Sequence, residues 1–465
     1  MLTIANATRI VVDERTELTG TLVLRDGVVA ETATGKARAT EKETAAAKDR
    51  LTGEETLTGK VTAPGEVTAA GEPQNPETLD ASGCVVTPGL VNAHHHLLQS
   101  AFRTLPGTRG VAMRDWLPTM AAAYARAGVD AELAAVAASV GVAEGLLCGV
   151  TTVADHHLTW PSGADSVAIA IATADAARAL GGRLVFVRGS ARDDPQEAAS
   201  SAEAIVRALL PRTGDGMLQL AVGPAGVHSD SRETFELFAE VAAKHGLRRR
   251  TQANEQVDVA IALEKYGKRP IDLLEDWGWL ESDVTLAHLC DVTGEEIRRL
   301  AASGITATHA PGCDLPMGWG IAPVAALRAA GIVVGLGTSG GGSNDAGHLL
   351  ADARLAMQVA PLVGPPIAAR EVLAMAMAGS AAGLGRSELG NLRTGSAADL
   401  CIWDVSGVAD AGVADPVAGL LWANPGRRPK HVVVAGRVVV RDYELVDADE
   451  RELVARLSAR VPRQA

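Results

Sequence analysis

Three consecutive histidines in the stretch "GLVNAHHHLLQS", residues 89–100, are the first side chains in the sequence that could bind a metal ion. The apolar run before them favours a β-strand, in which successive side chains point to opposite faces. His94 and His96 therefore point to one face and His95 to the other. A His-x-His pair on a strand is half of a zinc or iron site, because neutral imidazole suits both ions. A cluster of solvated histidines would give the same pattern, so the rest of a site has to come from elsewhere in the chain.

Further residues able to do acid–base chemistry follow other predicted strands. Glu255 follows the strand "LRRRTQANE", and His288 ends the strand in "TLAHLCD". A carboxylate suits proton transfer, and a histidine suits either proton transfer or metal binding. If both side chains lie beside the His-x-His pair, the four together predict an active site that uses a metal ion or transfers protons.

These residues need a scaffold that brings distant strand ends together. From residue 85 on, short β-rich segments alternate with Ala/Leu-rich helical segments. Eight such units in series predict an α/β fold, a parallel (β/α)8 TIM-type barrel, whose active site lies at the C-terminal ends of the strands. One helix has clear ends, because Thr293 and Glu296 form a capping box and Gly304 closes it.

Both ends of the chain differ in sequence pattern from the predicted barrel. Residues 1–33 and the tail around "HVVVAGRVVVRDYELV" alternate in strand fashion, so we expect them to form a small composite β-sandwich. Residues 34–79 are poor in large apolar side chains, which predicts a mobile insertion. The expected division is 1–85 for the N-terminal part of the sandwich, 86–392 for the catalytic barrel and 393–465 for the C-terminal part.

The composition excludes several classes of protein. The 465-residue chain carries a formal net charge of −13, which argues against nucleic acid or an anionic membrane as its main partner. No apolar stretch is long enough to span a bilayer, and the N-terminus lacks the basic and apolar regions of a signal peptide. Five scattered cysteines without a CxxC pair do not predict disulfides, so we expect a cytoplasmic protein.

Several longer motifs carry a resemblance to a known family: "PGLVNAHHHLLQS", "GVTTVADHH", "TLAHLCD", "MGWGIAPVAALRAAGIVVGLGTSGGGSND" and "LGNLRTGSAADLCIWD". Through nearly all of residues 80–465 they resemble the amidohydrolase superfamily, in particular its branch of 8-oxoguanine deaminase and the triazine hydrolases. The resemblance implies hydrolysis of a purine-, pyrimidine- or triazine-like nitrogen heterocycle by a water molecule that one zinc or iron ion activates. It also implies a homodimer or higher homo-oligomer.

The family's site residues carry over only in part. By resemblance, the metal ligands include His94, His96 and His288, and Glu255 is the proton shuttle. The strand-five ligand, a histidine in the family, is Gln252 here, which makes it a doubtful ligand. The strand-eight aspartate is Ser339, although triazine hydrolases resemble this chain in sometimes using a hydroxyl residue there. The predicted catalytic residues are thus Glu255, His288 and Ser339.

These two replacements leave the metal in question. An amide oxygen is a poorer zinc ligand than imidazole. Arg250, two residues before Gln252 and on the same face, adds a positive charge about 7 Å below the metal position, at roughly 3.4 Å per residue. We therefore expect a weakly bound metal ion or none.

Three classes of function stay open. The first is a metal-dependent aminohydrolase or chlorohydrolase, with Gln252 as an oxygen ligand or His228 in its place. The second is a metal-free lyase, isomerase or cyclase acting on a nitrogen heterocycle, in which Glu255 and the histidines transfer protons. The third is a relative without turnover.

Gln252 is a candidate for substrate binding as well as for metal binding. Three further residues are candidates for substrate binding, each with an ordinary structural alternative. Gln99 lies three residues after His96, where the resemblance implies a glutamine near the substrate, but a surface glutamine at a helix start would fit as well. Trp116 in "MRDWLP" and Trp319 in "MGWG" are candidate aromatic walls for a planar ring, or simply packed side chains.

Two further polar residues, His157 and Asp345, are expected to have specific roles. His157, at the end of strand two beside Asp155, is expected to bind the ligand or to orient His96. Asp345 is expected to cap the helix that begins near Gly347.

Overall fold

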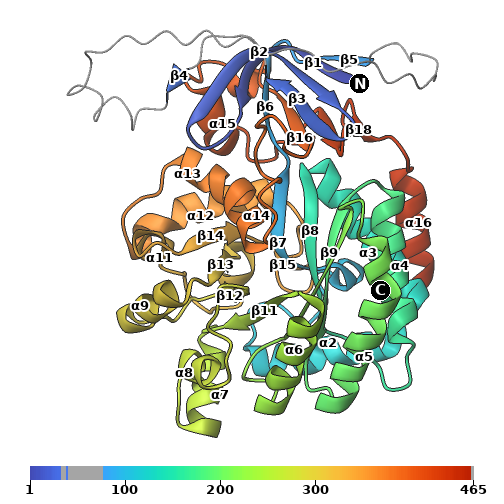
Figure 1. Ribbon diagram of the computed structural model, residues 1–465, viewed down its shortest axis with the longest axis vertical. Helices are drawn as coiled ribbons and strands as arrows, with labels where there is room; N and C mark the ends of the chain where they lie inside the picture. The colour runs from blue at the N-terminus through green and yellow to red at the C-terminus, as the bar shows by residue number, and fades with distance from the viewer. Residues whose placement is uncertain (33–37, 40–76, 462–465) are drawn as a thin grey trace, which may run out of the picture.

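The computed structural model describes residues 1–32, 38–39 and 77–461. Eight parallel strands form the barrel below the other sheet in Figure 1. They are β7 (Leu90–His96), β8 (Val150–His157), β9 (Arg183–Ser190), β10 (Leu218–Pro224), β11 (Arg248–Ala253), β12 (Val284–His288), β13 (Thr306–His309) and β14 (Val333–Leu336). A short strand, β15 (Ser339–Gly340), follows β14 and pairs with β7, so the path returns to its first strand. The predicted barrel is confirmed.

Helices cover the outside of the barrel, which is why its strands are buried on both faces and read as apolar runs. The helices after the strands include α3 (Ala131–Leu147), α4 (Ser166–Ala179), α5 (Pro195–Leu209), α6 (Arg232–His245), α7 (Val257–Tyr266), α8 (Pro270–Asp276), α9 (Gly294–Ser303), α11 (Val324–Ala329), α12 (Leu349–Val363), α13 (Ala369–Ala374) and α14 (Ser380–Gly383). Helix α9 begins with the predicted Thr293–Glu296 capping box and ends at Gly304, whose φ of +74° is left-handed.

The active-site end of the barrel also carries short segments between strands and helices. The 3-10 helix η2 (Leu97–Ala101) follows β7 directly, and α2 (Met113–Ala127) comes next. The four-residue helix α10 (Pro311–Asp314) follows β13. These segments place side chains near the C-terminal ends of the strands.

Strands from both ends of the chain form a second, mixed sheet at the top of Figure 1. Its path is β19-β18-β17-β16-β6-β1-β2-β3, with β4 on β2 and β5 on β1. The bounds are β1 (Leu2–Val11), β2 (Thr16–Arg25), β3 (Val28–Thr32), β4 (Arg38–Ala39), β5 (Glu77–Asp80), β6 (Cys84–Pro88), β16 (Leu400–Asp404), β17 (His431–Val434), β18 (Arg437–Arg441) and β19 (Glu444–Leu445). The predicted composite of N- and C-terminal strands is confirmed, and its strands follow one continuous path. The C-terminal strands are joined to helices α15 (Pro416–Trp422) and α16 (Glu450–Arg460), and α16 lies along α3 (Figure 1).

The insertion predicted over 34–79 lies mostly outside the described residues. Its described parts, 38–39 and 77–79, belong to strands β4 and β5. Strand β5 pairs in parallel with β1, from Leu2↔Glu77 to Ala5↔Asp80. We keep the division at 85/86 and 392/393 as a proposal.

One predicted helix cap is wrong. Helix α12 begins at Leu349, and the side chain of His348 accepts the N–H of Ala351 at its start. Asp345 instead accepts the backbone N–H of Thr104 at 2.6 Å and forms an ion pair with Arg109. Its own φ of +66° turns the chain away from the helix, so its carboxylate faces the loop after η2.

Two general expectations concern cysteines and membrane spans. All five cysteines are free thiols, as the sequence predicts. Within the described ranges, no helix combines the length and the apolar character that a bilayer crossing requires.

Candidate active site

Side chains from three barrel strands meet at the C-terminal mouth of the barrel. The ring of His94 lies 4.9 Å from that of His96 and 5.2 Å from that of His288, measured between centroids. The Nε2 atom of His288 lies 3.1 Å from Gln252 Oε1 and 3.6 Å from Glu255 Oε1. All five side chains are buried. The structure therefore brings together the residues that the sequence singles out on strands β7, β11 and β12.

Hydrogen bonds to backbone and carboxylate oxygens set the orientation of two of these imidazoles. The Nδ1–H of His96 donates to the carbonyl oxygen of His156 at 2.7 Å, and the Nδ1–H of His288 donates to Asp314 Oδ1 at 2.6 Å. Each bond fixes the proton on Nδ1 and leaves Nε2 for the site. The Nε2 atom of His94 is buried, and no residue in the described part of the chain forms a hydrogen bond with it. Burial lowers the pKa of His96 to about 4, so it is neutral, as a metal ligand must be.

Glu255 is presented by an unusual turn between β11 and α7. Its neighbours Asn254 and Gln256 both have positive φ, at +55° and +23°, a conformation that non-glycine residues adopt at a cost. The carboxyl is fully buried, and neither oxygen has a hydrogen-bond partner among the described residues. Burial raises its pKa to about 7, although His288 and His228 act in the opposite direction. A carboxyl poised near neutral pH can both accept and return a proton.

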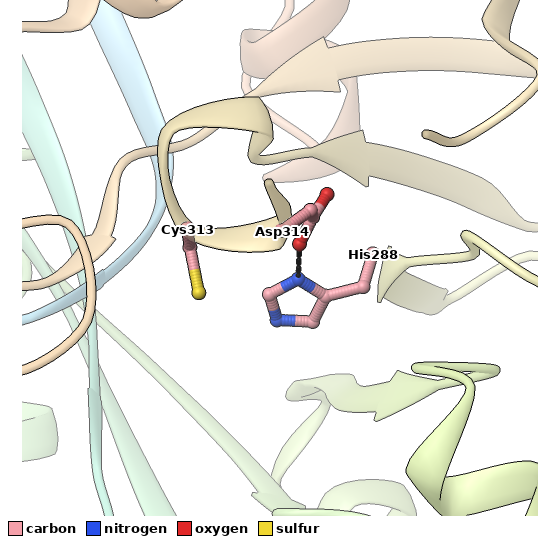
Figure 2. Close-up of side chains that lie close together, drawn as sticks. All are labelled: His288, Cys313 and Asp314. Atoms are coloured by element: carbon pink, nitrogen blue, oxygen red, sulfur yellow. Dashed lines mark hydrogen bonds and ion pairs between the residues drawn. The ribbon is translucent and has the colours of Figure 1, made fainter. Parts of the chain in front are cut away.

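Asp314 is a residue of this site that the sequence reading missed. It ends helix α10, and Figure 2 shows its carboxylate at His288 Nδ1, with Cys313 beside it. Its other oxygen, Oδ2, lies 3.6 Å from Nδ1 of His309 and has no hydrogen bond. The signal was present in "THAPGCD", where an acidic residue follows the end of strand β13.

The loop after β15 is held by two of the predicted substrate residues. Gln99 Oε1 accepts the N–H of Gly342 at 3.0 Å, and Trp116 Nε1–H donates to the carbonyl oxygen of the same residue at 3.0 Å. A Cβ on Gly340 would lie 2.0 Å from Gln99 Oε1, so this approach requires glycine. Both side chains therefore hold the backbone that follows Ser339.

His157 lies apart from this cluster. Its ring lies 4.5 Å from that of Trp160 and 6.0 Å from that of Phe186, and its Nε2 is 3.2 Å from the carbonyl oxygen of Thr159. The neighbouring residue His156 supplies the carbonyl that orients His96. Strand alternation explains the difference, because adjacent residues face opposite sides of β8.

Trp319 forms an aromatic wall against His288. The two ring centroids lie 5.1 Å apart at 87°, an edge-to-face arrangement. The side chain is buried, yet its Nε1–H finds no acceptor in residues 1–32, 38–39 and 77–461. This leaves one donor beside the imidazole for a bound molecule.

His228, the proposed substitute ligand, is already engaged. Its Nδ1 lies 3.2 Å from the Asp258 carboxylate. Burial lowers the pKa of His228, but Asp258 outweighs that effect and raises the pKa to about 8. Asp258 also accepts the backbone N–H of Asn254 at 2.9 Å, so this pair supports the turn that presents Glu255.

Arg250 lies inside the barrel, as strand alternation predicts. Its guanidinium donates to the carbonyl oxygens of Ala93 and Gly383, and no carboxylate in the described chain forms an ion pair with it. Burial lowers its pKa to about 9, which leaves it charged at neutral pH. Its charge in turn disfavours protonation of His94.

The donor set fits one divalent ion, with one weak ligand. Three imidazoles could offer Nε2, and an unpartnered buried nitrogen on His94 is the kind of atom that a metal ion satisfies. Gln252 would supply an amide oxygen. Among the described residues, one group of His, Cys, Asp or Glu has all its ligand atoms within 4.8 Å of one another, and that group is His288, Cys313 and Asp314.

Comparison with known proteins gives a consistent set of relatives. Residues 85–439 match the Amidohydrolase family. The chain is 35% identical over 398 residues to 8-oxoguanine deaminase of Pseudomonas aeruginosa, which covers 81% of this chain and 87% of that protein. It is 32% identical over 383 residues to 5-methylthioadenosine/S-adenosylhomocysteine deaminase of Halobacterium salinarum, covering 81% and 86%. The crystal structure of atrazine chlorohydrolase TrzN from Arthrobacter aurescens complexed with zinc is 33% identical, covers 99% of this chain and 100% of that one, and has a TM-score of 0.85.

Proposed function

The chain belongs to the amidohydrolase family, and from that premise we propose that it hydrolyses a nitrogen heterocycle. The reaction replaces a leaving group on an electron-poor ring carbon with a hydroxyl group. The ring is purine-, pyrimidine- or triazine-like, and the leaving group is ammonia, an amine or chloride. The deaminases and the chlorohydrolase to which the chain is similar support this class of reaction.

The buried carboxyl of Glu255, which lies 3.6 Å from His288 Nε2 but accepts no hydrogen bond from the described residues, is the single observation that carries the proposal. A carboxyl with no hydrogen bond in a closed site is costly unless it serves a ligand or a water molecule. In the proposed reaction a water oxygen attacks the ring carbon, and Glu255 accepts one of its protons. Glu255 then delivers the proton to the ring nitrogen or the leaving group while the C–N or C–Cl bond breaks.

The proposed metal ligands are His94, His96 and His288. Gln252 is proposed as a fourth and weaker ligand. A zinc or iron ion held there would supply Lewis-acid activation of the attacking water. The hydrogen bonds of His96 and His288 keep their rings in the tautomer that such binding needs. Ser339, on the short strand β15 that pairs with β7, is proposed to act beside them.

The proposed substrate contacts lie around His288. The Trp319 ring supplies a flat apolar wall, and its free N–H can donate to a ring nitrogen or a carbonyl oxygen of the substrate. Gln99 and Trp116 are proposed to act through the Gly342 loop that both side chains hold. His157 is kept as a more distant contributor, because its ring packs on Trp160.

One observation favours a second candidate function. Arg250 donates to the carbonyl oxygen of Ala93 and has no carboxylate partner among the described residues, so its charge disfavours a dication. A metal-free lyase, isomerase or cyclase that uses Glu255 and His288 for proton transfer is therefore the alternative. We also propose that the protein is cytoplasmic, in keeping with its free thiols. We further propose that it is a homo-oligomer.

A substrate screen tests the proposed function. The full chain, with zinc or iron added, is incubated with aminopurines, aminopyrimidines, aminotriazines and chlorotriazines, and release of ammonia and chloride is measured. We expect release from at least one compound and a loss of about 10²–10⁴-fold in Glu255→Gln. No release with either metal, or equal rates in the variant, contradicts the proposal. A change in ring absorbance without either product supports the metal-free alternative.

A further inference from the structure

Asp314 places a carboxylate between two buried histidines. Oδ1 accepts the Nδ1–H of His288 at 2.6 Å, and Oδ2 lies 3.6 Å from Nδ1 of His309. All three side chains are buried. We propose that Asp314 is a positioning residue, which fixes the proton of His288 on Nδ1 and turns its Nε2 toward Gln252 and Glu255.

The fold holds Asp314 in place through the backbone of a short helix. The N–H of Gly312 in α10 donates to Asp352 Oδ1 on α12 at 2.7 Å, and Asp352 Oδ2 accepts the side-chain amide of Asn344 at 3.0 Å. A Cβ on Gly312 would lie 2.4 Å from Asp352 Oδ1, so the helix can approach α12 this closely only with glycine there. Helix α10 is therefore held against α12, and Asp314 at its end has little freedom to move.

The His288 ring needs such a partner because its other contacts do not select a tautomer that leaves Nε2 free. The Nε2 atom faces Gln252 Oε1, an acceptor, which by itself favours a proton on Nε2. Trp319 packs edge-on against the ring and makes no hydrogen bond to it. The backbone of His288 has a φ of +76°, so the residue is already held in an unfavourable conformation. The ionised acceptor at Nδ1 outweighs the neutral amide, because charge-assisted hydrogen bonds are the stronger ones.

A metal centre formed by His288, Cys313 and Asp314 is the competing interpretation of this cluster (Figure 2). The three residues offer nitrogen, sulfur and oxygen ligands that zinc accepts. However, the 2.6 Å between Nδ1 and Oδ1 is a hydrogen-bond distance and leaves no room for an ion between the two atoms. The positioning role therefore agrees better with the geometry.

The inference deepens the proposed function and rests on it for the site that His288 serves. Its test needs neither substrate nor metal, so it can fail while the proposed function stands. The full chain is labelled with ¹⁵N in its histidine rings, and the His288 signals are assigned by their loss in His288→Gln. Spectra are recorded in metal-free buffer at alkaline pH, where the two neutral tautomers have distinct ¹⁵N shifts. We expect the wild-type His288 to carry its proton on Nδ1.

Removing the carboxylate should move that proton. In Asp314→Leu the remaining acceptor is Gln252 Oε1, so we expect the proton on Nε2. Asp314→Asn keeps the shape of the side chain and should give a mixture of the two tautomers. It serves as the test if the leucine variant does not fold. A wild-type His288 without a proton on Nδ1, or an Asp314→Leu or Asp314→Asn variant that keeps the wild-type tautomer unmixed, overturns the proposal.

Two controls separate positioning from general disruption. Asp352→Asn changes another buried carboxylate next to α10 that touches no imidazole, and Cys313→Ser removes the neighbouring thiol. Both should leave the His288 tautomer unchanged. If Cys313→Ser removes bound zinc that the wild type retains, the cluster is a metal centre and the proposal is wrong. With a substrate in hand, we expect Asp314→Asn to lower kcat by at least about 10²-fold and to leave KM nearly unchanged.

Discussion

The Nε2 atom of His288 and the Oε1 atom of Gln252 lie 3.1 Å apart, so side chains of the neighbouring strands β12 and β11 meet at the barrel mouth. The nitrogen that would bind a metal ion is therefore shared with an amide group. An imidazole at position 252 would replace the amide oxygen with a fourth nitrogen ligand.

The variant Gln252→His should raise metal affinity. Imidazole replaces an amide oxygen, a poorer ligand for a borderline ion such as zinc. We expect zinc or iron retained after dialysis to increase, with affinity rising by at least about tenfold. Elemental analysis of the dialysed protein measures this. Gln219→His on β10, whose amide donates to the carbonyl oxygen of Leu384, is the control and should retain no extra metal. Equal metal content in the wild type and Gln252→His would refute the inferred ligand position.

The variant Arg250→Met should also raise metal affinity, for an electrostatic reason. A guanidinium about 7 Å from a dication opposes binding by on the order of 2–5 kcal/mol at an effective dielectric constant near 20. We expect at least a tenfold gain, measured by competition with a chelator. Arg248→Met removes the same charge from a partly exposed position two residues earlier and should have a smaller effect. A larger gain in the Arg248 variant would show that distance to the site is not what matters.

The variant Trp319→Phe should impair turnover without impairing stability. Phenylalanine keeps a ring against His288 but removes an N–H that has no partner in the described part of the chain. We expect kcat/KM for the identified heterocycle to fall roughly tenfold, the cost of one unsatisfied hydrogen bond. Trp116→Phe, in contrast, loses the bond to Gly342 and should lower the melting temperature. A drop in the melting temperature of Trp319→Phe as large as that of Trp116→Phe would mean that the indole N–H is structural.

Patterns along the sequence predicted the barrel and placed the histidines of β7 and β12 and Glu255 at its mouth. They succeeded because strand alternation and the position of strand ends are properties of a few adjacent residues. The partner of His288 could not be read in this way. Asp314 is 26 residues away, and it reaches the ring only because Gly312 lets helix α10 approach α12 closely.

Asp345 also shows that local sequence patterns do not reveal a partner that is distant in the chain. An acidic residue just before a helix suggests a cap, and this one lies four residues before Leu349. Its left-handed backbone and its ion pair with Arg109 place it elsewhere. A side chain's local preference does not reveal that a residue more than 200 positions earlier in the chain competes for it.

The His228–Asp258 pair should make stability depend on pH. The folded-state pKa of His228, about 8, is raised above the unfolded value of about 6.5. The stabilisation is therefore complete below about pH 6.5 and is lost as pH rises through about 8. We expect His228→Gln to lower the free energy of unfolding by up to about 2 kcal/mol more at pH ~6 than at pH ~9.5. Urea unfolding at both values measures this. Asp258→Asn should lose the same pH-dependent part, whereas a pH-independent difference would rule out a charged pair.

Strand β6 lies between β1 at the start of the chain and β16, which ends at Asp404, and it runs almost directly into the first barrel strand. During synthesis the nascent chain can pair β6 with β1 early, but its other edge stays open until the ribosome has passed Asp404. An open strand edge is where chains pair with one another and aggregate. The segment that contains β16 therefore covers, late in synthesis, the edge of a strand made near the beginning of the chain.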